Sequence, residues 1–247
     1  MVEEAGTRIH VDPGPGALVR AIQAGIDPEN IDAFVLTHRH LDHSADINTL
    51  IEAKTMGGWN PGGKVFAPED ALSGEDPVIY RYHRKNLDEV RVISEENIFN
   101  MGSIKLKCAM KHQHHGVETY GLIFENESWR LAYITDGKYQ EEMLKAYEGS
   151  DAVIINTTFR KPRELDHMSL EDAVTLLKGI KPRLGIIYHF GMEILRMGLV
   201  KAAQYVEENS GVKTIPAKEF TAVSFESGFR VEKIKLKNPL GFSPYWK

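Results

Sequence analysis

The segment THRHLDHSAD, residues 37–46, follows directly on the apolar run IDAFVL, residues 31–36. It holds three of the ten histidines of the chain, His38, His40 and His43. Side chains alternate along an extended strand, so His38, His40 and Asp42 share one side, and His43 follows where the chain should turn into a helix. Clustered imidazoles repel one another when they are protonated, and they gain little when they are neutral unless a cation lies between them. The segment therefore predicts a metal site at the end of a buried strand, with ligands that suit zinc, iron or manganese.

The composition is that of an ordinary globular protein: 42% of the 247 residues are hydrophobic, 26% are charged, and the net charge is −5. No run of four or more lysines and arginines occurs, so no extended nucleic-acid surface is expected. No apolar run approaches the roughly 18 residues of a membrane span, and the acidic N-terminus does not resemble a signal peptide. The single cysteine, Cys108, excludes an intrachain disulfide. We expect a cytoplasmic protein. The isolated His10 and His83 are expected to be ordinary hydrogen-bonded residues.

Apolar periodicity and turn residues predict alternating strands and helices. Strands are expected at residues 7–12, 32–37, 103–111, 119–126, 129–135, 151–158, 183–189 and 229–237. Helices are expected at residues 16–26, 44–54, 139–149, 169–180 and 191–209, with Ser44 and Ser169 as N-terminal caps. No linker is long enough to divide domains. We therefore predict a single layered α/β domain over residues 1–247, with two sheets inside and helices outside.

Three further segments place metal-binding side chains beside or at the ends of apolar strands. The segment KHQHHGVETYG holds His112, His114 and His115, AYITDG ends in Asp136, and GIIYHFG carries His189. Layered α/β folds usually build their sites at the carboxyl tips of buried strands. Four such tips in one chain favour a shared metal site.

The run His38-Arg39-His40-Leu41-Asp42-His43 resembles the HxHxDH signature of the metallo-β-lactamase fold superfamily. The loop VDPGPG, residues 11–16, resembles the first loop of that superfamily, with Asp12 as its acidic residue. His115, Asp136 and His189 follow in the order of its later motifs. The resemblance covers about residues 8–192 and implies a four-layer αββα sandwich.

The resemblance also implies two divalent metal ions, with zinc favoured and manganese or iron as alternatives. One ion would be bound by His38, His40 and His115, and the other by Asp42, His43 and His189. Asp136 would bridge both, together with a water or hydroxide. Related phosphodiesterases place the third-motif ligand six residues before the glycine of a Tyr-Gly pair, as His115 stands before Gly121. His114 is the alternative ligand, and Asp12, His112 and His114 are candidates for orienting the ligands.

Within the superfamily, the chain resembles the group that contains tRNase Z and the cyclic phosphodiesterases of phosphonate breakdown. The 21 residues from His115 to Asp136 leave no room for the tRNA-clamping arm of short-form tRNase Z. His167, 22 residues before His189, matches the catalytic histidine of the group. One cysteine, however, cannot build the structural zinc site of the phosphonate enzyme.

Little chain precedes the DPG loop, so either the first sheet lacks an edge strand or the chain is a truncated form. The strand at residues 7–12 should then lie near a sheet edge. Because exposed edges invite pairing, we expect a homodimer.

Two divalent ions with two carboxylates and one hydroxide leave a positive pocket, which favours a small anionic substrate such as a phosphodiester. Metal binding would supply the hydroxide nucleophile. Asp42 and His167 are the candidate catalytic residues, and His167 would donate a proton to the leaving alkoxide or hold a phosphate oxygen. Thr158 and Arg160, in the segment TTFRKPRELDH, are candidate substrate contacts.

Three other classes of protein are alternatives to a phosphodiesterase. A thioester or lactone hydrolase would use the same seven ligands but would not need His167. A flavodiiron-type redox protein would carry a carboxylate in its first motif and a flavin domain, and neither is present. A non-catalytic metal-binding protein would usually have lost ligands, and none is lost. The sequence therefore predicts a metal-dependent hydrolase, with a phosphodiesterase as the leading hypothesis.

Overall fold

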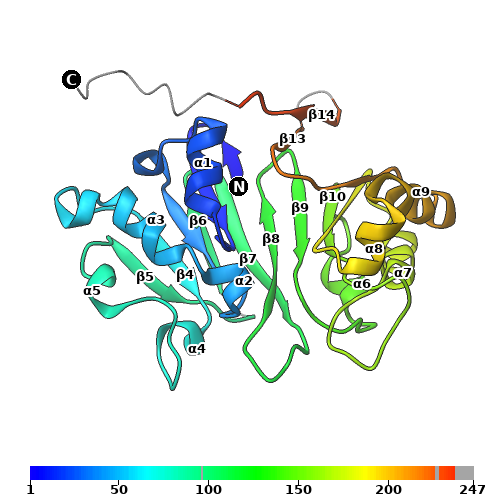
Figure 1. Ribbon diagram of the computed structural model, residues 1–247, viewed down its shortest axis with the longest axis horizontal. Coiled ribbons are helices and arrows are strands. Elements are labelled where there is room, and N and C mark those ends of the chain that lie inside the picture. Colours follow the sequence, from blue (N-terminus) through cyan, green and yellow to red (C-terminus); the bar gives the residue numbers. More distant parts are fainter. Residues whose placement is uncertain (96, 226–227, 237–247) are drawn as a thin grey trace. The chain divides into compact units, whose positions relative to one another are not determined.

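Two larger β-sheets organise the chain, and each belongs to its own structural unit (Figure 1). The computed structural model describes residues 1–95, 97–225 and 228–236. The first unit comprises Met1–Ala67, Ala71–Val92 and the described residues from Glu219 onward. The second unit comprises Pro68–Asp70 and Ile93–Lys218.

The sheet of the first unit has five strands in sequence order. They are β1 (Val2–Glu4), β2 (Thr7–Val11), β3 (Ala33–Val35), β4 (Lys64–Ala67) and β5 (Glu89–Val92). Strands β2 to β5 are parallel, and the helices lie in the connections between them. These are α1 (Ala17–Ala24), η1 (Pro28–Asn30), α2 (Leu41–Ser44), α3 (Ile47–Lys54), η2 (Met56–Gly58) and α5 (Arg81–Arg84). Helix α4 (Glu69–Leu72) has residues in both units, and a hairpin of β13 (Thr221–Ser224) and β14 (Arg230–Lys233) ends the described chain.

Strand β3 positions the opening motif of the first unit. All three of its residues are buried, as the apolar run predicted, and burial continues through Leu36, Thr37 and His38. The core beneath it is formed by apolar residues of the sheet and of α3. Its buried members are Ile31, Phe34, Leu36, Ile47, Leu50, Ile51, Val65, Ala67, Ala71, Leu72 and Ile79. Each such side chain contributes roughly 1.5–3 kcal/mol when it leaves water, so the strand end is held firmly.

Strand β1 is an edge strand that the sequence did not predict. It pairs antiparallel with β2, and Glu4 stands opposite Thr7. Only Ala5 and Gly6 connect them, with φ angles of 47° and 85°, as a tight two-residue hairpin loop requires. Three residues are too few to show a period, which is why the strand escaped notice. The edge of this sheet is therefore β1, and β2 lies one strand inside it.

The sheet of the second unit has seven strands, in the order β12-β11-β10-β9-β8-β7-β6. They are β6 (Ile98–Met101), β7 (Ile104–Lys111), β8 (Tyr120–Glu125), β9 (Arg130–Ile134), β10 (Ala152–Asn156), β11 (Leu184–Tyr188) and β12 (Thr214–Pro216). Strands β6 to β9 form an antiparallel meander, and β9 to β12 are parallel. Strands β7, β9, β10 and β11 consequently run in one direction, and their carboxyl ends meet at one edge of the sheet.

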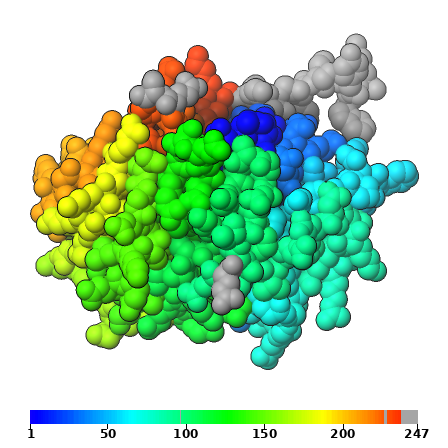
Figure 2. Space-filling view, turned by 180° about the vertical axis from the view of Figure 1, so that it is seen from behind, coloured from blue at the N-terminus to red at the C-terminus, as the bar shows by residue number. Residues whose placement is uncertain are grey.

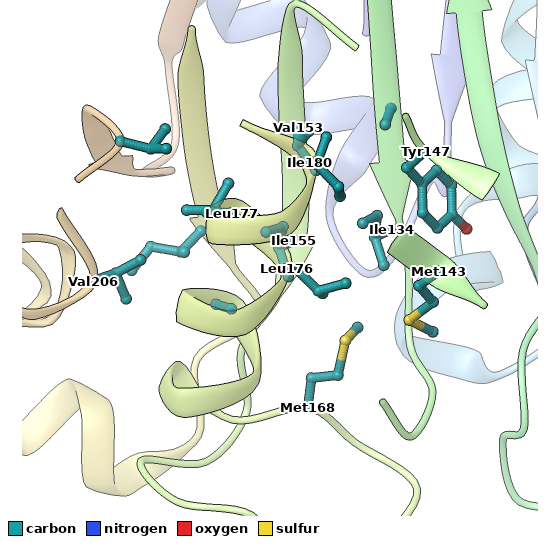
Figure 3. Close-up of a cluster of buried hydrophobic side chains, with 14 of the residues drawn as sticks. Ile134, Met143, Tyr147, Val153, Ile155, Met168, Leu176, Leu177, Ile180 and Val206 are labelled. Atoms are coloured by element: carbon teal, nitrogen blue, oxygen red, sulfur yellow. The ribbon is translucent and has the colours of Figure 1, made fainter. Parts of the chain in front are cut away.

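Helices α6 (Met143–Ala146), α7 (Leu170–Ile180), α8 (Met192–Met197) and α9 (Leu199–Ser210) accompany this sheet. Side chains of α6, α7 and α9 pack with those of β9 and β10 into one apolar cluster, in which Ile134, Tyr147, Ile155 and Leu176 lie close together (Figure 3). Helix α9, in orange, forms part of the outer surface of this unit (Figure 2). No helix in the described part of the chain is long and apolar enough to cross a membrane.

Most predicted strands are confirmed. Strand β7 alternates as expected, with Ile104, Leu106, Cys108 and Met110 buried, and a bulge lies between Cys108 and Met110. Strand β14 lies inside the predicted strand 229–237, whose last residue falls outside the described residues. The strands that were not predicted, β1, β4, β5, β6, β12 and β13, have three or four residues each. Such lengths give weak periodicity.

The predicted helices are confirmed with changed boundaries. Helix α1 ends at Gly25, whose φ is 77°, as expected. The predicted helix 191–209 is divided into α8 and α9 at Gly198, whose φ of 94° is incompatible with a right-handed helix. The predicted helix 139–149 is reduced to the four residues of α6.

Ser44 does not cap α3, contrary to the prediction. It is the last residue of α2, and its hydroxyl donates to the carbonyls of Arg39 and His40 at 3.0 and 2.9 Å. Ser169, by contrast, caps α7 as predicted. Its hydroxyl accepts from the amide of Asp172 at 3.2 Å, and the Asp172 carboxylate accepts from the Ser169 amide at 2.8 Å, so the two residues form a capping box.

The Ser169 cap makes a quantitative prediction. Ser169→Ala removes the acceptor for one amide at the start of α7, and should lower the free energy of unfolding by about 1 kcal/mol. Urea denaturation monitored by circular dichroism measures the change. Thr175→Ala, at an exposed position of the same helix, is the control and should change stability by less than about 0.5 kcal/mol. Equal losses in both variants would contradict the role assigned to the cap.

Candidate metal centre

The second unit gathers Asp136, His167 and His189 with His114 and His115 at the carboxyl edge of its sheet. Asp136 follows β9, His189 follows β11, and the His112–His115 segment follows β7. Oδ2 of Asp136 lies 3.3 Å from Nε2 of His189 and 3.7 Å from Nε2 of His114. The predicted convergence of strand tips is therefore observed within this unit.

The Asp136 carboxylate is almost fully buried. Its Oδ1 accepts a short hydrogen bond from the side-chain amide of Asn156, at the end of β10. Its Oδ2 faces His114 and His189, and also Nδ1 of His167 at 3.5 Å. One oxygen is thus fixed by a neutral donor, and the other faces imidazoles. A buried carboxylate is costly unless a cation compensates it, so this arrangement suits a metal ligand.

His114 and His115 differ in environment. His114 is buried, and its Nδ1 lies 2.9 Å from the carbonyl oxygen of Asp166, which can only accept. Nδ1 of His114 therefore carries the proton, and the lone pair of the neutral ring is on Nε2, the atom that faces Asp136. His115 is exposed, with its backbone amide donating to the Asp166 carboxylate at 2.9 Å. The geometry favours His114 over His115 as a ligand beside Asp136.

His112 plays a different part. It is buried, with Nδ1 3.0 Å from the carbonyl oxygen of Asp136 and Nε2 2.6 Å from the hydroxyl of Tyr147. Nδ1 donates to the carbonyl and Tyr147 donates to Nε2, so both nitrogens are engaged. Burial lowers the pKa of His112 to about 4, partly opposed by the hydrogen bond to Asp136, and keeps the ring neutral. His112 thus fixes the backbone of Asp136.

Gly121 makes room for this pair. A Cβ atom built at Gly121 would lie 1.7 Å from the Tyr147 hydroxyl and 2.6 Å from Nε2 of His112. The glycine of the Tyr-Gly pair is therefore required by the His112–Tyr147 hydrogen bond. Tyr147 itself belongs to the apolar cluster, and burial raises its pKa well above the ordinary value (Figure 3).

His167 stands among the imidazoles of this unit. Its ring lies 4.9 Å from that of His114, 5.3 Å from that of His115 and 5.5 Å from that of His189, measured between centroids. Ring nitrogens of His114, His115 and His167 lie within 4.8 Å of one another, close enough to share a metal ion. The predicted catalytic histidine is therefore beside Asp136, where it can touch whatever binds there.

Thr158 positions two of these rings. Its hydroxyl lies 3.1 Å from Nδ1 of His189 and 3.3 Å from Nδ1 of His167. It thus acts on the histidines, a role that the sequence did not predict. Asn156 and Asp166 were missed as well. Asn156 could have been found as the polar residue at the end of β10, and Asp166 as the carboxylate next to His167.

The first unit assembles Asp12, Thr37, His38 and His43 around one carboxylate. Oδ2 of Asp12 lies 3.1 Å from Nδ1 of His43 and accepts from the Thr37 hydroxyl at 2.7 Å. Because that hydroxyl donates to Asp12, it accepts from Nδ1 of His38 at 3.0 Å. Both rings therefore carry their proton on Nδ1 and offer Nε2. Asp12 thus fixes the His43 ring directly and the His38 ring through Thr37.

His40 and Asp42 complete the opening motif. The ring of His38 lies 4.9 Å from that of His40 and 4.2 Å from that of His43, and Nε2 of His43 is 3.7 Å from Oδ2 of Asp42. A Cβ at Gly14 would lie 2.0 Å from the carbonyl oxygen of Asp42, so the DPG loop must pass this turn with glycine. Each unit thus presents imidazole nitrogens and a carboxylate. This donor set fits divalent zinc, iron or manganese.

Backbone conformation is unusual at several of these positions. Asp12, His115 and His189 have φ angles of 46°, 43° and 62°, a region that costs non-glycine residues about 1 kcal/mol or more. Such strain persists only where surrounding contacts impose it. At Asp12 and His189 those contacts are the hydrogen bonds described above.

The remaining predicted residues lie apart from these clusters. Arg160 lines a surface pocket of about 450 Å³ in the second unit with Lys161, Pro162, Arg163, Glu193 and Arg196. His83 is buried beside Glu52, with Nδ1 3.3 Å from the carboxylate, and burial lowers its pKa. Burial also lowers the pKa of His10 to about 3.

Solved structures identify the fold. The chain is similar to the metallo-β-lactamase fold protein YhfI of Bacillus subtilis, with a TM-score of 0.75 and 19% identity over 88% of this chain and 87% of that one. It is also similar to a diphosphatase of the PhnP family, with a TM-score of 0.69 and 19% identity over 92% of this chain and 84% of that one. The chain therefore has the metallo-β-lactamase fold, as predicted.

The family follows from the sequence match. Residues 7–190 match the Beta-lactamase superfamily domain, so the chain belongs to this superfamily. A ribonuclease Z of Methanopyrus kandleri is 35% identical over 56% of this chain and 47% of its own length. The chain thus spans about half of that relative. Membership makes the chain a metal-dependent hydrolase, which confirms that prediction.

The buried His112 predicts how stability depends on pH. Its pKa is about 4 in the folded chain and about 6.5 when unfolded, so the unfolded state takes up the proton first as pH falls. The stabilising effect is complete above pH 6.5 and is lost down to about pH 4, at a cost of roughly 3 kcal/mol. Urea denaturation of chelator-treated protein at pH 7 and pH 4 measures it. His112→Gln should flatten the slope, and identical slopes would refute this account.

Proposed function

We propose that the chain hydrolyses a phosphodiester with two divalent metal ions, zinc being the favoured metal. The proposal rests chiefly on the buried Asp136 carboxylate, whose Oδ2 faces three imidazoles. Family membership supports the metal, and the names ribonuclease Z and diphosphatase support phosphoryl chemistry in similar proteins. A cytoplasmic location and a homodimer remain predictions.

The proposed ligands follow the family pattern with one change. His38, His40 and His114 would hold one ion, and Asp42, His43 and His189 the other, with Asp136 as a ligand to both. His114 replaces His115 in this assignment because its Nδ1 is fixed by a carbonyl and its Nε2 faces Asp136. When bound, the metals lower the pKa of water from 15.7 to about 7 and polarise phosphoryl oxygens.

The protein residues supply orientation and a proton. Asp12, Thr37 and the Asp166 carbonyl hold the ligand rings with Nε2 outward. Asp42 stays a proposed catalytic residue as well as a ligand. His167, in contact distance of Asp136 and held by Thr158, is proposed to protonate the leaving alkoxide or to bind a phosphate oxygen. If His167 has no role in phosphodiester cleavage, hydrolysis of a thioester or lactone is the alternative activity.

The ligand assignment predicts metal contents. Protein purified without chelator should contain close to two transition-metal ions per chain by elemental analysis. His114→Ala should lose at least one of them, because it removes a proposed ligand. His115→Ala, the matched control in the same loop, should keep both. Loss with His115→Ala and retention with His114→Ala would restore His115 as the ligand, and a wild-type content of one, unchanged by added metal, would refute the dinuclear site.

The role of His167 predicts a dependence on the leaving group. His167→Ala should keep its metal content and thermal stability, and should lower phosphodiester turnover by about 10²–10⁴-fold. The loss should be smaller for nitrophenyl esters, whose leaving groups need little protonation. Equal losses on good and poor leaving groups would indicate phosphate binding instead. Loss of metal would make His167 a ligand, and full activity on phosphodiesters would exclude both proposed roles.

A further inference from the structure

The pocket around Arg160 has an unusual charge. Its lining carries four cations, Arg160, Lys161, Arg163 and Arg196, and one anion, Glu193. Arg163 forms an ion pair with Glu193. Among the described residues, Arg160, Lys161 and Arg196 form no ion pair and no side-chain hydrogen bond, so three positive charges remain uncompensated around a pocket of about 450 Å³.

The pocket is built by two segments that are fixed to each other. The Arg163–Glu193 ion pair joins the 159–167 loop to α8, and the Arg163 guanidinium lies 4.8 Å above the Phe159 ring. The amide of Gly191 donates to the carbonyl of Thr158 at 3.1 Å. A Cβ at Gly191 would come within 2.4 Å of that carbonyl oxygen, so glycine is needed for this close approach. The two segments that carry the positive charges are therefore fixed to each other.

Both segments come directly from the candidate metal centre. The loop runs from Thr158, which holds His189, to His167, and α8 begins three residues after His189. The Phe159 ring makes two contacts. Its centroid lies 6.2 Å from that of the His167 ring, and the Arg163 guanidinium lies 4.8 Å from it. Phe159 therefore contacts both His167 and one residue of the pocket lining.

We propose that this pocket binds a second phosphate group of the substrate. The inference rests on the proposed phosphodiesterase function: the scissile phosphate would lie by Asp136 and His167, and a further phosphate on the same molecule would be held by Arg160, Lys161 and Arg196. Guanidinium groups bind phosphate oxygens through paired N–H donors, and neighbouring like charges repel unless an anion lies between them. The substrate class is therefore a phosphodiester that carries another phosphate.

Exposed cations by themselves would indicate only a solvated loop. The arrangement of these cations is a further observation. The three charges face one concave site from two segments, and the only carboxylate in the lining is paired with the fourth cation. A long polyanion would need basic residues beyond one pocket. The second phosphate can be a terminal monoester or the next phosphodiester of a short oligonucleotide, and the substrates below separate these two sources.

Binding can be measured without catalysis. Calorimetric titration of chelator-treated protein with inorganic pyrophosphate removes the metals and the reaction from the readout. We expect salt-sensitive binding by the wild type, weakened about 10-fold or more in Lys161→Gln/Arg196→Gln. Arg196→Lys, which keeps the charge, should retain part of the affinity, and Lys178→Gln, an exposed cation of α7 outside the pocket, should bind as the wild type does. No binding by the wild type, or equal binding by the double variant, would overturn the proposal.

Substrate preference is tested with metal-loaded protein on three probes: a dinucleotide, the same dinucleotide with a terminal phosphate, and a trinucleotide without one. The wild type should show a KM about 10-fold lower for one of the two probes with an added phosphate, and the double variant should lose that preference. Preference for the phosphorylated dinucleotide identifies a monoester, and preference for the trinucleotide identifies a neighbouring diester. A preference unchanged in the double variant would refute the pocket. Failure to cleave any phosphodiester would refute the proposed function, while pyrophosphate binding would still report on the pocket.

Discussion

The negative charge of the buried Asp136 carboxylate must be compensated, and the arrangement of the second unit depends on this requirement. Asp136 lies almost wholly out of water, where an unpaired negative charge costs several kcal/mol. Asn156 binds one carboxylate oxygen, and His112 holds the backbone carbonyl of Asp136. The other oxygen faces His114, His167 and His189, and the geometry fits a cation there. The layout of β7, β9, β10 and β11 is what brings these residues to one edge.

The same requirement explains how the rings of His38, His43 and His114 are held. A neutral imidazole can give a lone pair to a metal from one nitrogen only, and the proton on the other needs an acceptor. The acceptor is the Asp12 carboxylate for His43, the Thr37 hydroxyl for His38 and the Asp166 carbonyl for His114. Because each acceptor contacts Nδ1, each ring presents Nε2. Three different acceptor types produce one tautomer, which is a stronger sign of metal binding than the number of histidines.

The sequence predicted which strand tips carry polar side chains, but it does not show how the surroundings of neighbouring histidines differ. The motif at residues 38–43 and the tip residues Asp136 and His189 follow from apolar runs that end in a polar side chain, and such runs are visible in one dimension. The distinction between His114 and His115 depends on a positive φ at His115 and on the position of the Asp166 carbonyl, and both arise from tertiary packing. Short strands such as β1 were missed because three residues have no detectable period.

Glycine positions show a further limit of sequence patterns. In the sequence, Gly121 of the Tyr-Gly pair lies six residues after the predicted ligand His115. Its physical role is to leave space for the His112–Tyr147 hydrogen bond. Gly191 likewise allows the start of α8 to reach the Thr158 carbonyl, and thereby joins the pocket of Arg160 and Arg196 to the loop that carries His167. In both places the missing side chain permits a contact between residues that are distant in the sequence. This backbone contact at Gly191 joins the segment that carries Arg196 to the loop that carries Arg160 and His167.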